Sequence, residues 1–313
     1  MSAPRRLVPF ALVFVGALSL GLAAGPGGWP DASIFWNLRL PRVLLGAAVG
    51  AGLATAGTVL QGLSGNPLAD PFVLGSSSGA AAGVVLGRIL GLSYASAAAF
   101  ALAGAGAFGA LALAWALART GGRVPIERLI LAGVAVSTLA SASVLLALHL
   151  GGRDAYAILS FLVGNLSNAD ERLLAAGGGT SVLAVAAACL FGRTLNAMAL
   201  GEEKARSLGI RVERAKTLLA LLCSAIVGAA VAVAGMIGFV GLIVPHAARR
   251  FAGPDHRALL PASALGGAAF LVLVDALART AAPPMEFPVG VVTALCGAPF
   301  FLYVLRRPRP RLA

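Results

Sequence analysis

Charged side chains are scarce in this sequence. Asp, Glu, Lys and Arg make up 12% of the 313 residues, whereas an ordinary soluble protein carries about 25%. Hydrophobic residues make up 59%, and apolar runs of 18 or more residues recur along the whole length. A run of about 20 apolar residues spans the hydrocarbon core of a bilayer, and the short alternating segments of a membrane β-barrel are missing. The sequence therefore predicts an all-α polytopic membrane protein.

Motifs for metal binding and nucleotide binding are also missing. Cys189, Cys223 and Cys296 are isolated in apolar stretches with no CxxC pair, so we interpret them as buried apolar residues. The three histidines lack a ligand spacing such as HExxH, which argues against a metal site but leaves haem binding by one histidine open. No GxxxxGK[ST] loop occurs. We therefore expect no cofactor and no enzyme activity, and any ATPase that drives this chain must be a separate chain.

The apolar runs predict ten membrane spans. They cover residues 7–25, 43–62, 72–91, 95–117, 129–149, 173–192, 217–235, 237–249, 259–280 and 288–305. The first run follows Arg5 and Arg6 like a signal peptide, but it is long enough to cross a bilayer, so we interpret it as a retained span. The uncharged stretch 217–248 is too long for one span. Its central GMIGFVG predicts a break, followed by a short or partly re-entrant helix that ends at Pro245-His246.

The basic residues indicate how the chain is oriented. With the N-terminus inside, 18 of the 24 basic residues lie in cytoplasmic segments and six lie outside. The six are Arg39, Arg42, Arg88, Arg153, Arg172 and Arg279. This bias satisfies the positive-inside rule and predicts both termini in the cytoplasm. The same loops explain the net charge of +12 without a nucleic acid partner.

One segment is far richer in charge than the rest of the chain. Between Leu200 and Lys216, eight of 17 residues are charged, against 36 charged residues (24 basic and 12 acidic) in the whole chain. Charge at this density between apolar spans must face water or another protein. The loop count places the segment on the cytoplasmic side, where we predict a protein partner for it.

Two further patterns concern helix packing. Glycines recur at every fourth residue of the third predicted span: Gly75, Gly79, Gly83, Gly87 and Gly91. This stripe predicts a close contact with a neighbouring helix. On the ninth span, Asp275 and Arg279 lie four residues apart and share a helix face. They form either an internal ion pair or a site where Arg279 faces the outside. Asp70, between two prolines in NPLADP, is interpreted as part of a turn.

Five stretches carry long and specific motifs. They are RLPRVLLGAAVGAGLATAGTVLQGLSGNPLADPFVLGSSSGAAAG (39–83), the charged segment from Leu200, GMIGFVGLIVPHAARR (235–250), DHRALLPASALGGA (255–268) and FPVGVVTALCGAPFFLYVLRR (287–307). In order and over nearly the whole chain, they resemble the FecCD-type permeases, the membrane subunits of ABC importers for iron–siderophores, haem and cobalamin. The resemblance implies one permease domain over 1–313, with the fold of a type II ABC importer and about ten transmembrane helices per subunit. It also implies the cytoplasmic (inner) membrane of a bacterium or archaeon.

The resemblance further implies partners and site residues. It implies a homodimer around a central path, two copies of a cytoplasmic ABC ATPase, and a periplasmic or lipid-anchored substrate-binding protein. Residues 193–216 match the family's coupling segment, which seats on the ATPase; its core positions are Gly201, Glu202, Glu203, Ala205, Arg206, Leu208 and Gly209. Arg39, Arg42 and Arg279 match arginines that meet acidic residues of the binding protein. The family's cytoplasmic gate falls at Val124, Pro125 and Ile126, where the hydroxyl residues common in relatives are absent. Residues 151–171 match a short outer helix by position.

The sequence leaves alternatives open for the substrate and for the class of transport mechanism. We expect an iron chelate (ferric siderophore or haem), with cobalamin as the alternative, because relatives for all of these share the motifs. The alternative from another class of protein is an ion-coupled secondary transporter, which is expected to have intramembrane carboxylates or an inverted repeat. Asp275 is the only acidic residue well inside a predicted span, and the two halves of the sequence do not match by eye. An intramembrane hydrolase lacks a nucleophile–base pair that the spacing could support.

Overall fold

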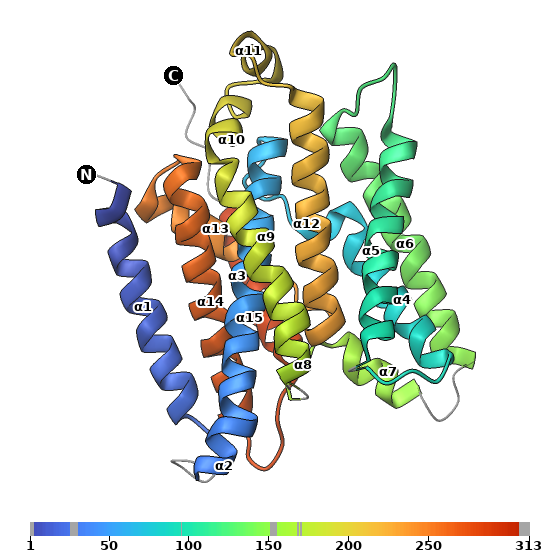
Figure 1. Cartoon of the computed structure of the whole chain (residues 1–313), viewed down its shortest axis with the longest axis vertical. Coiled ribbons are helices and arrows are strands. Elements are labelled where there is room, and N and C mark those ends of the chain that lie inside the picture. Colours follow the sequence, from blue (N-terminus) through green and yellow to red (C-terminus); the bar gives the residue numbers. More distant parts are fainter. Residues whose placement is uncertain are drawn as a thin grey trace.

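The computed structural model describes residues 3–25, 31–94, 96–150, 155–167, 169 and 171–306, and this part of the chain is helical without any strand. The elements are α1 (Ala3–Ala23), α2 (Ala32–Ile34), η1 (Phe35–Arg39), α3 (Leu40–Ser64), η2 (Pro71–Leu74), α4 (Ser76–Ile89), α5 (Ala97–Ala118), α6 (Ile126–Leu150), α7 (Ala155–Leu162), α8 (Glu171–Leu173), η4 (Leu174–Gly178), α9 (Gly179–Leu190), α10 (Gly192–Met198), α11 (Glu202–Ser207), α12 (Val212–Ala234), α13 (Val240–Ala252), α14 (His256–Thr280) and α15 (Val289–Arg306). Most of the long helices run along one common direction (Figure 1). The short helices α11 and α7 lie at opposite ends of this bundle, which we call the α11 end and the α7 end.

Each of the ten predicted spans corresponds to one helix or to consecutive helices. Seven helical stretches of the described chain are long and apolar enough to cross a membrane: Arg6–Ala23, Ala32–Ser64, Ala97–Ala118, Ile126–His149, Glu171–Leu190, Val212–Ala234 and His256–Thr280. The other three are shorter, since α4 has 14 residues, α13 has 13, and the apolar part of α15 covers Val289–Val304. The predicted all-α membrane bundle is confirmed.

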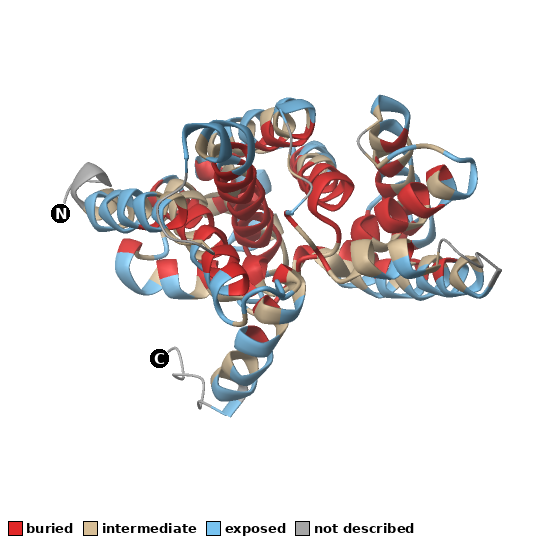
Figure 2. Cartoon of the chain, turned by 90° about the horizontal axis from the view of Figure 1, so that it is seen from below, coloured by how far each residue is buried: buried red, intermediate tan, exposed pale blue. Residues whose placement is uncertain are grey.

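Helix α3 lies at the centre of the bundle. Helices α9, α12, α13 and α14 pack around it, and nearly all of its residues between Val43 and Gly62 are buried. Viewed along the bundle, buried residues gather where helices face one another and exposed residues form the rim (Figure 2). Large apolar side chains are prominent among the exposed residues: Leu131, Leu183, Leu190 and Leu295 are each 70% exposed or more. Soluble proteins rarely expose such surfaces, so this rim suits lipid.

The glycine stripe of α4 brings this helix against α5. A Cβ atom on Gly79 would meet the carbonyl oxygen of Gly106, and one on Gly83 would meet the carbonyl oxygen of Leu102. Because only a hydrogen fits at these two positions, the backbones of α4 and α5 lie in direct contact. The predicted packing contact is confirmed there, whereas Gly91 at the end of the stripe faces open space.

The helix after the predicted break is longer than expected. Gly235 and Phe239 have positive φ angles of 70° and 67°, which confirms the break, but α13 then continues through Pro245 to Ala252. The prediction that it ends at Pro245-His246 is wrong. A proline has no N–H for the carbonyl four residues earlier, here that of Gly241. The side chain of Gln61 donates to this carbonyl instead (Nε2–O 3.3 Å), so the carbonyl is satisfied and the helix continues.

A glycine on α3 gives a test of how tightly this core is packed. A Cβ atom on Gly57 would meet the backbone of Gly241 on α13. We expect Gly57→Ala to push α3 and α13 apart and to lower the free energy of unfolding by about 1–3 kcal/mol. Thermal unfolding of the purified protein in detergent measures the effect. Gly104→Ala is the matched control, because a Cβ atom added to Gly104 would meet no atom of a neighbouring element within 4 Å. Equal unfolding temperatures for the two variants would contradict the prediction.

Helix α12 reaches from one end of the bundle to the other. It begins next to α11 and is buried along most of its length. At the α7 end, the carbonyl of Ala234 accepts a hydrogen bond from the backbone N–H of Asn165 (2.8 Å). A Cβ atom on Gly235 would meet the carbonyl oxygen of Phe161, so α12 ends directly against α7. Helix α7 lies where a short outer helix is predicted; residues 151–154, 168 and 170 of that stretch are outside the described residues.

Candidate functional site

The charged segment 200–216 folds into a short helix between two glycine turns. Gly201 (φ 104°) precedes α11 and Gly209 (φ 81°) follows it, both in a region of φ that favours glycine. Ala205 is completely buried and packs with Met198, Val212 and Ala215, which fixes α11 on α10 and on the start of α12. The side of α11 that faces away from this contact is exposed, and Leu208, at the end of the helix, is 63% exposed. The segment is therefore held rigidly at the α11 end while one apolar side chain points outward.

Ion pairs fasten this segment to α12. Lys216 lies within 2.5 Å of Glu202 and 3.6 Å of Glu213 (N–O distances). Arg206 contacts the same two carboxylates at 3.0 and 3.5 Å. The side chain of Lys216 is only 3% exposed, although it is a strongly hydrated cation. Burial of such a group is tolerated because both carboxylates and one carbonyl surround it.

That carbonyl belongs to Val124, in the predicted gate. The ammonium group of Lys216 donates to the carbonyl oxygen of Val124 (3.1 Å), and the backbone N–H of Val124 donates to Glu213 (3.3 Å). Lys216 and Glu213 thus hold both backbone groups of one residue; we call this arrangement the Val124 clasp. Pro125 and Ile126 follow immediately, and α6 begins at Ile126. The structure brings the predicted coupling segment and the predicted gate segment together.

The sequence prediction did not single out Lys216 and Glu213 among the site residues. Both fall inside the predicted segment 193–216, but the resemblance points to positions 201–209 only. A signal was available, since Lys216 is one of only two lysines in the chain and lies three residues after Glu213 at the mouth of an apolar span.

At the α7 end, three arginines form a second cluster. Arg42 binds Asp275 through Nε (3.0 and 3.1 Å) and Nη2 (2.9 Å), and Glu286 through Nη1 (2.8 Å). Arg279 binds the same Asp275 (Nε–Oδ2 3.1 Å) and the carbonyl of Gly21 (2.9 Å). The predicted pairing of Asp275 with Arg279 is therefore observed. Asp275 is 1% exposed and lies between two guanidinium groups.

The predicted docking arginines lie together in this cluster, and all three are buried. Arg39 donates to the carbonyls of Leu22 and Ala23 at the end of α1 (3.2 and 2.9 Å). The exposed fractions are 7% for Arg39, 9% for Arg42 and 3% for Arg279. A cavity of about 460 Å³ adjoins the three guanidinium groups and is also lined by Ser167 and Glu286. Among the described residues, Arg42 and Arg279 share the two carboxylates of Asp275 and Glu286.

The Glu286 carboxylate gives this cluster a pH dependence. Burial alone would raise the pKa of Glu286, but the charge of Arg42 and hydrogen bonds from Arg42 and Ser167 lower the pKa below its ordinary value of 4.5. Its stabilising contribution is therefore complete above about pH 4.5 and disappears as the pH falls through the lowered pKa. We expect Glu286→Gln to lower the unfolding temperature near neutral pH, and we expect this effect to disappear as the pH falls below 4.5 and through the lowered pKa. Unfolding scans across this range measure it, with exposed Glu203→Gln as control; an effect of Glu286→Gln that persists in acid would contradict it.

A third feature is a groove lined by hydroxyl groups. About 530 Å³ in volume, it lies between α4, α6 and the break after α12. Five hydroxyl side chains line it: Ser77, Ser78, Ser137, Thr138 and Ser141. The other lining residues are apolar, and none is charged. The sequence analysis missed this groove because the hydroxyls come from two helices, and only the fold places them on one wall.

The described residues contain no group of three or more His, Cys, Asp or Glu side chains placed to hold a metal ion.

Comparisons with known proteins relate these features to a family. The model of the FecCD transport family matches residues 11–307. The cobalamin import permease BtuC of Halobacterium salinarum is 46% identical over 89% of this chain and 75% of its own length. The hemin transport permease HmuU of Yersinia pestis is 40% identical (98% and 97% covered), and the Fe(3+)-citrate import permease YfmD of Bacillus subtilis is 38% identical (97% and 96% covered). An inward-facing structure of a metal-chelate type ABC transporter superposes with a TM-score of 0.89 at 32% identity, covering 96% of this chain and 99% of that one.

Proposed function

This chain belongs to the FecCD transport family, and from that premise we propose that it is the membrane permease of an ATP-driven importer for an iron chelate, a ferric siderophore or haem. It forms a homodimer, takes substrate from a binding protein at the α7 end, and binds one ATPase per subunit at the α11 end. The α11 end then faces the cytoplasm, as do both termini. The observation that carries the proposal is the charged helix α11 at one end of an otherwise apolar bundle. Its Glu202 pairs with Lys216 at the start of α12, and Lys216 also bonds Val124 just before α6.

Uptake into vesicles tests this proposal against the secondary-transporter alternative. The permease is reconstituted with its ATPase and binding protein, and uptake of labelled ferric siderophore, haem and cobalamin is measured separately. We expect uptake that requires Mg-ATP and the ATPase. Uptake driven by a proton gradient in the absence of the ATPase would overturn the proposal. Uptake of cobalamin alone would keep the importer and change its substrate.

The coupling role belongs to α11 and the turns around it. Glu202, Glu203 and Arg206 supply charge and Leu208 an exposed apolar contact, a combination typical of protein interfaces with a polar rim. Gly201 and Gly209 fix the two turns, and the buried Ala205 anchors the helix. Motion of the ATPase against this element reaches the proposed gate residues Val124, Pro125 and Ile126 through the Val124 clasp.

The docking role belongs to the α7 end. Arg39, Arg42 and Arg279 line an open cavity, and arginines at a cavity favour an acidic partner surface. Charge complementarity of this kind acts on docking orientation and association rate more than on affinity. The bonds inside the cluster also position the arginines, since each guanidinium is held by carboxylates or carbonyls of the same chain.

The hydroxyl-lined groove is the proposed wall of the substrate path. Uncharged hydroxyls can exchange hydrogen bonds with a large chelate without holding it by a fixed charge. Iron-chelate and cobalamin relatives both resemble this chain, and a groove without charge suits either. We keep iron chelates first and cobalamin as the alternative. Haem, Fe(3+)-citrate and vitamin B12 permeases all align over nearly the whole of this chain and of their own lengths, so the uptake measurement decides between them.

Narrowing this groove gives a specific prediction. We expect Thr138→Phe together with Ser141→Phe to reduce uptake at least about tenfold, because two aromatic rings would fill much of its volume, while ATP hydrolysis and unfolding temperature stay near wild type. Ser143→Phe, on the same helix but outside the groove lining, is the matched control. Equal uptake by both variants would remove the groove from the path.

A further inference from the structure

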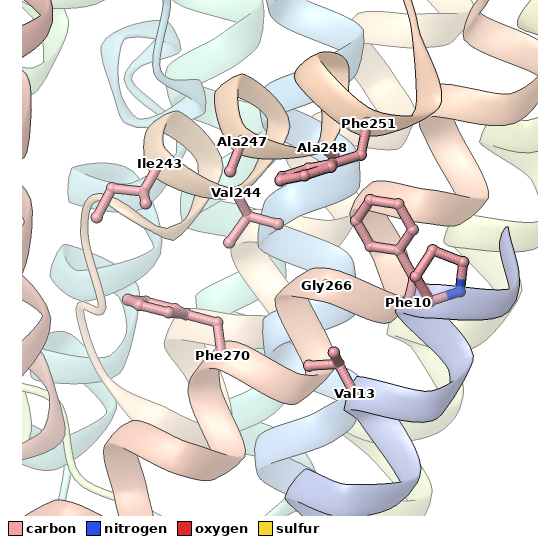
Figure 3. A pocket seen from close by; sticks show the side chains of 10 residues that line it. Phe10, Val13, Ile243, Val244, Ala247, Ala248, Phe251, Gly266 and Phe270 are labelled. Atoms are coloured by element: carbon pink, nitrogen blue, oxygen red, sulfur yellow. The ribbon is translucent and has the colours of Figure 1, made fainter. Parts of the chain in front are cut away.

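An apolar groove of about 390 Å³ lies on the outside of the bundle between α1, α13 and α14. Its lining residues are Pro9, Phe10, Val13, Ile243, Val244, Ala247, Ala248, Phe251, Gly266 and Phe270. Figure 3 shows Phe10 and Val13 of α1 across the groove from α13, with Phe270 of α14 below. All lining residues are apolar, and the groove opens sideways, since Val13 is 57% exposed and Phe251 is 70% exposed.

Two arginines continue the walls of this groove toward the α11 end. Arg6 lies four residues before Phe10 on α1, and Arg250 lies three residues after Ala247 on α13. Residues three or four apart share a helix face, so Arg6 lies one turn before the apolar lining of α1, and Arg250 lies on the same face as Ala247, next to the lining residue Phe251. The Nη1 atom of Arg6 donates to the carbonyl of Ala252 (3.0 Å), which holds its guanidinium over the end of α13. Arg250 is exposed.

The groove therefore has an apolar body and a cationic end. The Phe10 and Phe251 rings pack edge to face, with centroids 6.5 Å apart, at the junction of the two parts. No Asp or Glu lines the groove. The carboxylate of Asp255, just beyond α13, accepts hydrogen bonds from the side chain of Asn196 and from the backbone N–H of Arg257. Basic pockets between membrane helices on the cytoplasmic side suit anionic lipid headgroups, and a guanidinium matches the geometry of phosphate.

We propose that this groove binds one anionic phospholipid of the cytoplasmic leaflet. An acyl chain lies along Val13, Ile243 and Phe270, and the phosphate contacts Arg6 and Arg250. The two arginines beside an apolar groove match a ligand that joins an anionic head to an apolar tail, whereas a neutral apolar ligand would not need them. The site lies on the lipid-facing side of α1 and does not depend on transport, so it is tested on the permease alone.

Lipid retention measured by native mass spectrometry tests the charged end. The full-length permease is reconstituted in nanodiscs of equimolar phosphatidylglycerol and phosphatidylcholine and then released in detergent. We expect wild type to retain phosphatidylglycerol preferentially, and Arg6→Gln with Arg250→Gln to lose that preference. Arg123→Gln with Arg193→Gln removes two exposed arginines elsewhere at the α11 end and should behave as wild type. Unchanged preference in the first pair, or no preference in wild type, would overturn the proposal.

A second variant tests the apolar body independently of charge. Ala247→Phe fills the groove at an exposed position and leaves both arginines in place. We expect it to lose the retained phosphatidylglycerol while its unfolding temperature stays near that of wild type. Val13→Trp, on the lipid-facing side of α1, narrows the groove from the opposite wall and serves if Ala247→Phe does not fold. Full retention in the folded variant would place the lipid elsewhere and overturn the proposal.

Discussion

Asp275→Ala is expected to lower the free energy of unfolding by about 3–5 kcal/mol, the cost of removing one partner from a buried ion pair. Asp275 lies between Arg42 and Arg279 and binds both within 3.1 Å. Its loss leaves two guanidinium groups buried, with only Glu286 to balance them. Thermal or chemical unfolding of the purified permease in detergent measures the change, and a low yield of folded protein is part of the same expectation.

A rescue experiment separates charge from packing. The triple variant Asp275→Leu, Arg42→Met and Arg279→Met removes Asp275 together with the two arginines that bind it. Replacing a complete buried ion-pair set by apolar residues is often neutral for stability. We expect it to be much closer to wild type than Asp275→Ala. Glu203→Gln, which removes the charge of an exposed carboxylate on α11, should cost no more than about 1 kcal/mol. If Asp275→Ala were as mild as Glu203→Gln, the ion pairs of Asp275 would not stabilise the α7 end.

The triple variant also tests docking. Because it keeps the fold but lacks Arg42 and Arg279, binding of the substrate-binding protein should fall while the ATPase still assembles. Undiminished binding would leave the arginines with a structural role only.

Lys216→Met is expected to uncouple ATP hydrolysis from uptake. The ammonium group of Lys216 is the one side-chain donor to the Val124 carbonyl among the described contacts, and it separates the Glu202 and Glu213 carboxylates. Without it Arg206 still pairs with both carboxylates, but of the two bonds of the clasp Val124 keeps only the one through its N–H. Coupling free energies between sites are about 1–3 kcal/mol, so we expect the ratio of uptake to ATP hydrolysis to fall about 5- to 150-fold.

Lys204→Met is the matched control for Lys216→Met. It makes the same chemical change, lysine to methionine, at the other lysine of the chain. Lys204 lies on the exposed face of α11 and has no bond to Val124 among the described contacts. We expect its ratio of uptake to hydrolysis to stay near wild type. Equal ratios in the two variants would rule out the clasp as the coupling route, and loss of ATPase binding in both would instead point to a shared contact with the ATPase.

Much of the bundle could be predicted from sequence because its signals are local. Apolar runs predict spans, and glycine at every fourth residue predicts the α4–α5 contact, since both depend on residues within one helix. The end of α13 could not be predicted in this way. A proline inside a span reads as a stop, and only the side chain of Gln61, 180 residues away, satisfies the carbonyl that Pro245 leaves free.

The candidate site residues show the same difference between local signals, which the sequence carries, and long-range contacts, which it does not. The charged segment 200–216 predicts a partner surface because its density of charge is visible in one window. The bonds of its last residue to Val124, and of Arg42 to Asp275, join positions 92 and 233 residues apart. A single sequence carries no record of such pairs. Burial of Arg42 accompanies its bond to Asp275, and burial of Arg39 accompanies its bonds to the end of α1. A count of outer-loop charges cannot show either contact.

Helix α12 acts as a lever through the membrane. Its 23 residues make a rod of about 34 Å at 1.5 Å per residue, with Lys216 near one end and the contact with Asn165 and Phe161 at the other. A tilt of roughly 5° about its first turn would move the far end by about 3 Å. We therefore expect a push on α11 to move α7, at the other end of the bundle, through the tilt of α12 as one rigid rod. Spin labels on α7 and α11 should show both helices shifting in the same step of the ATPase cycle.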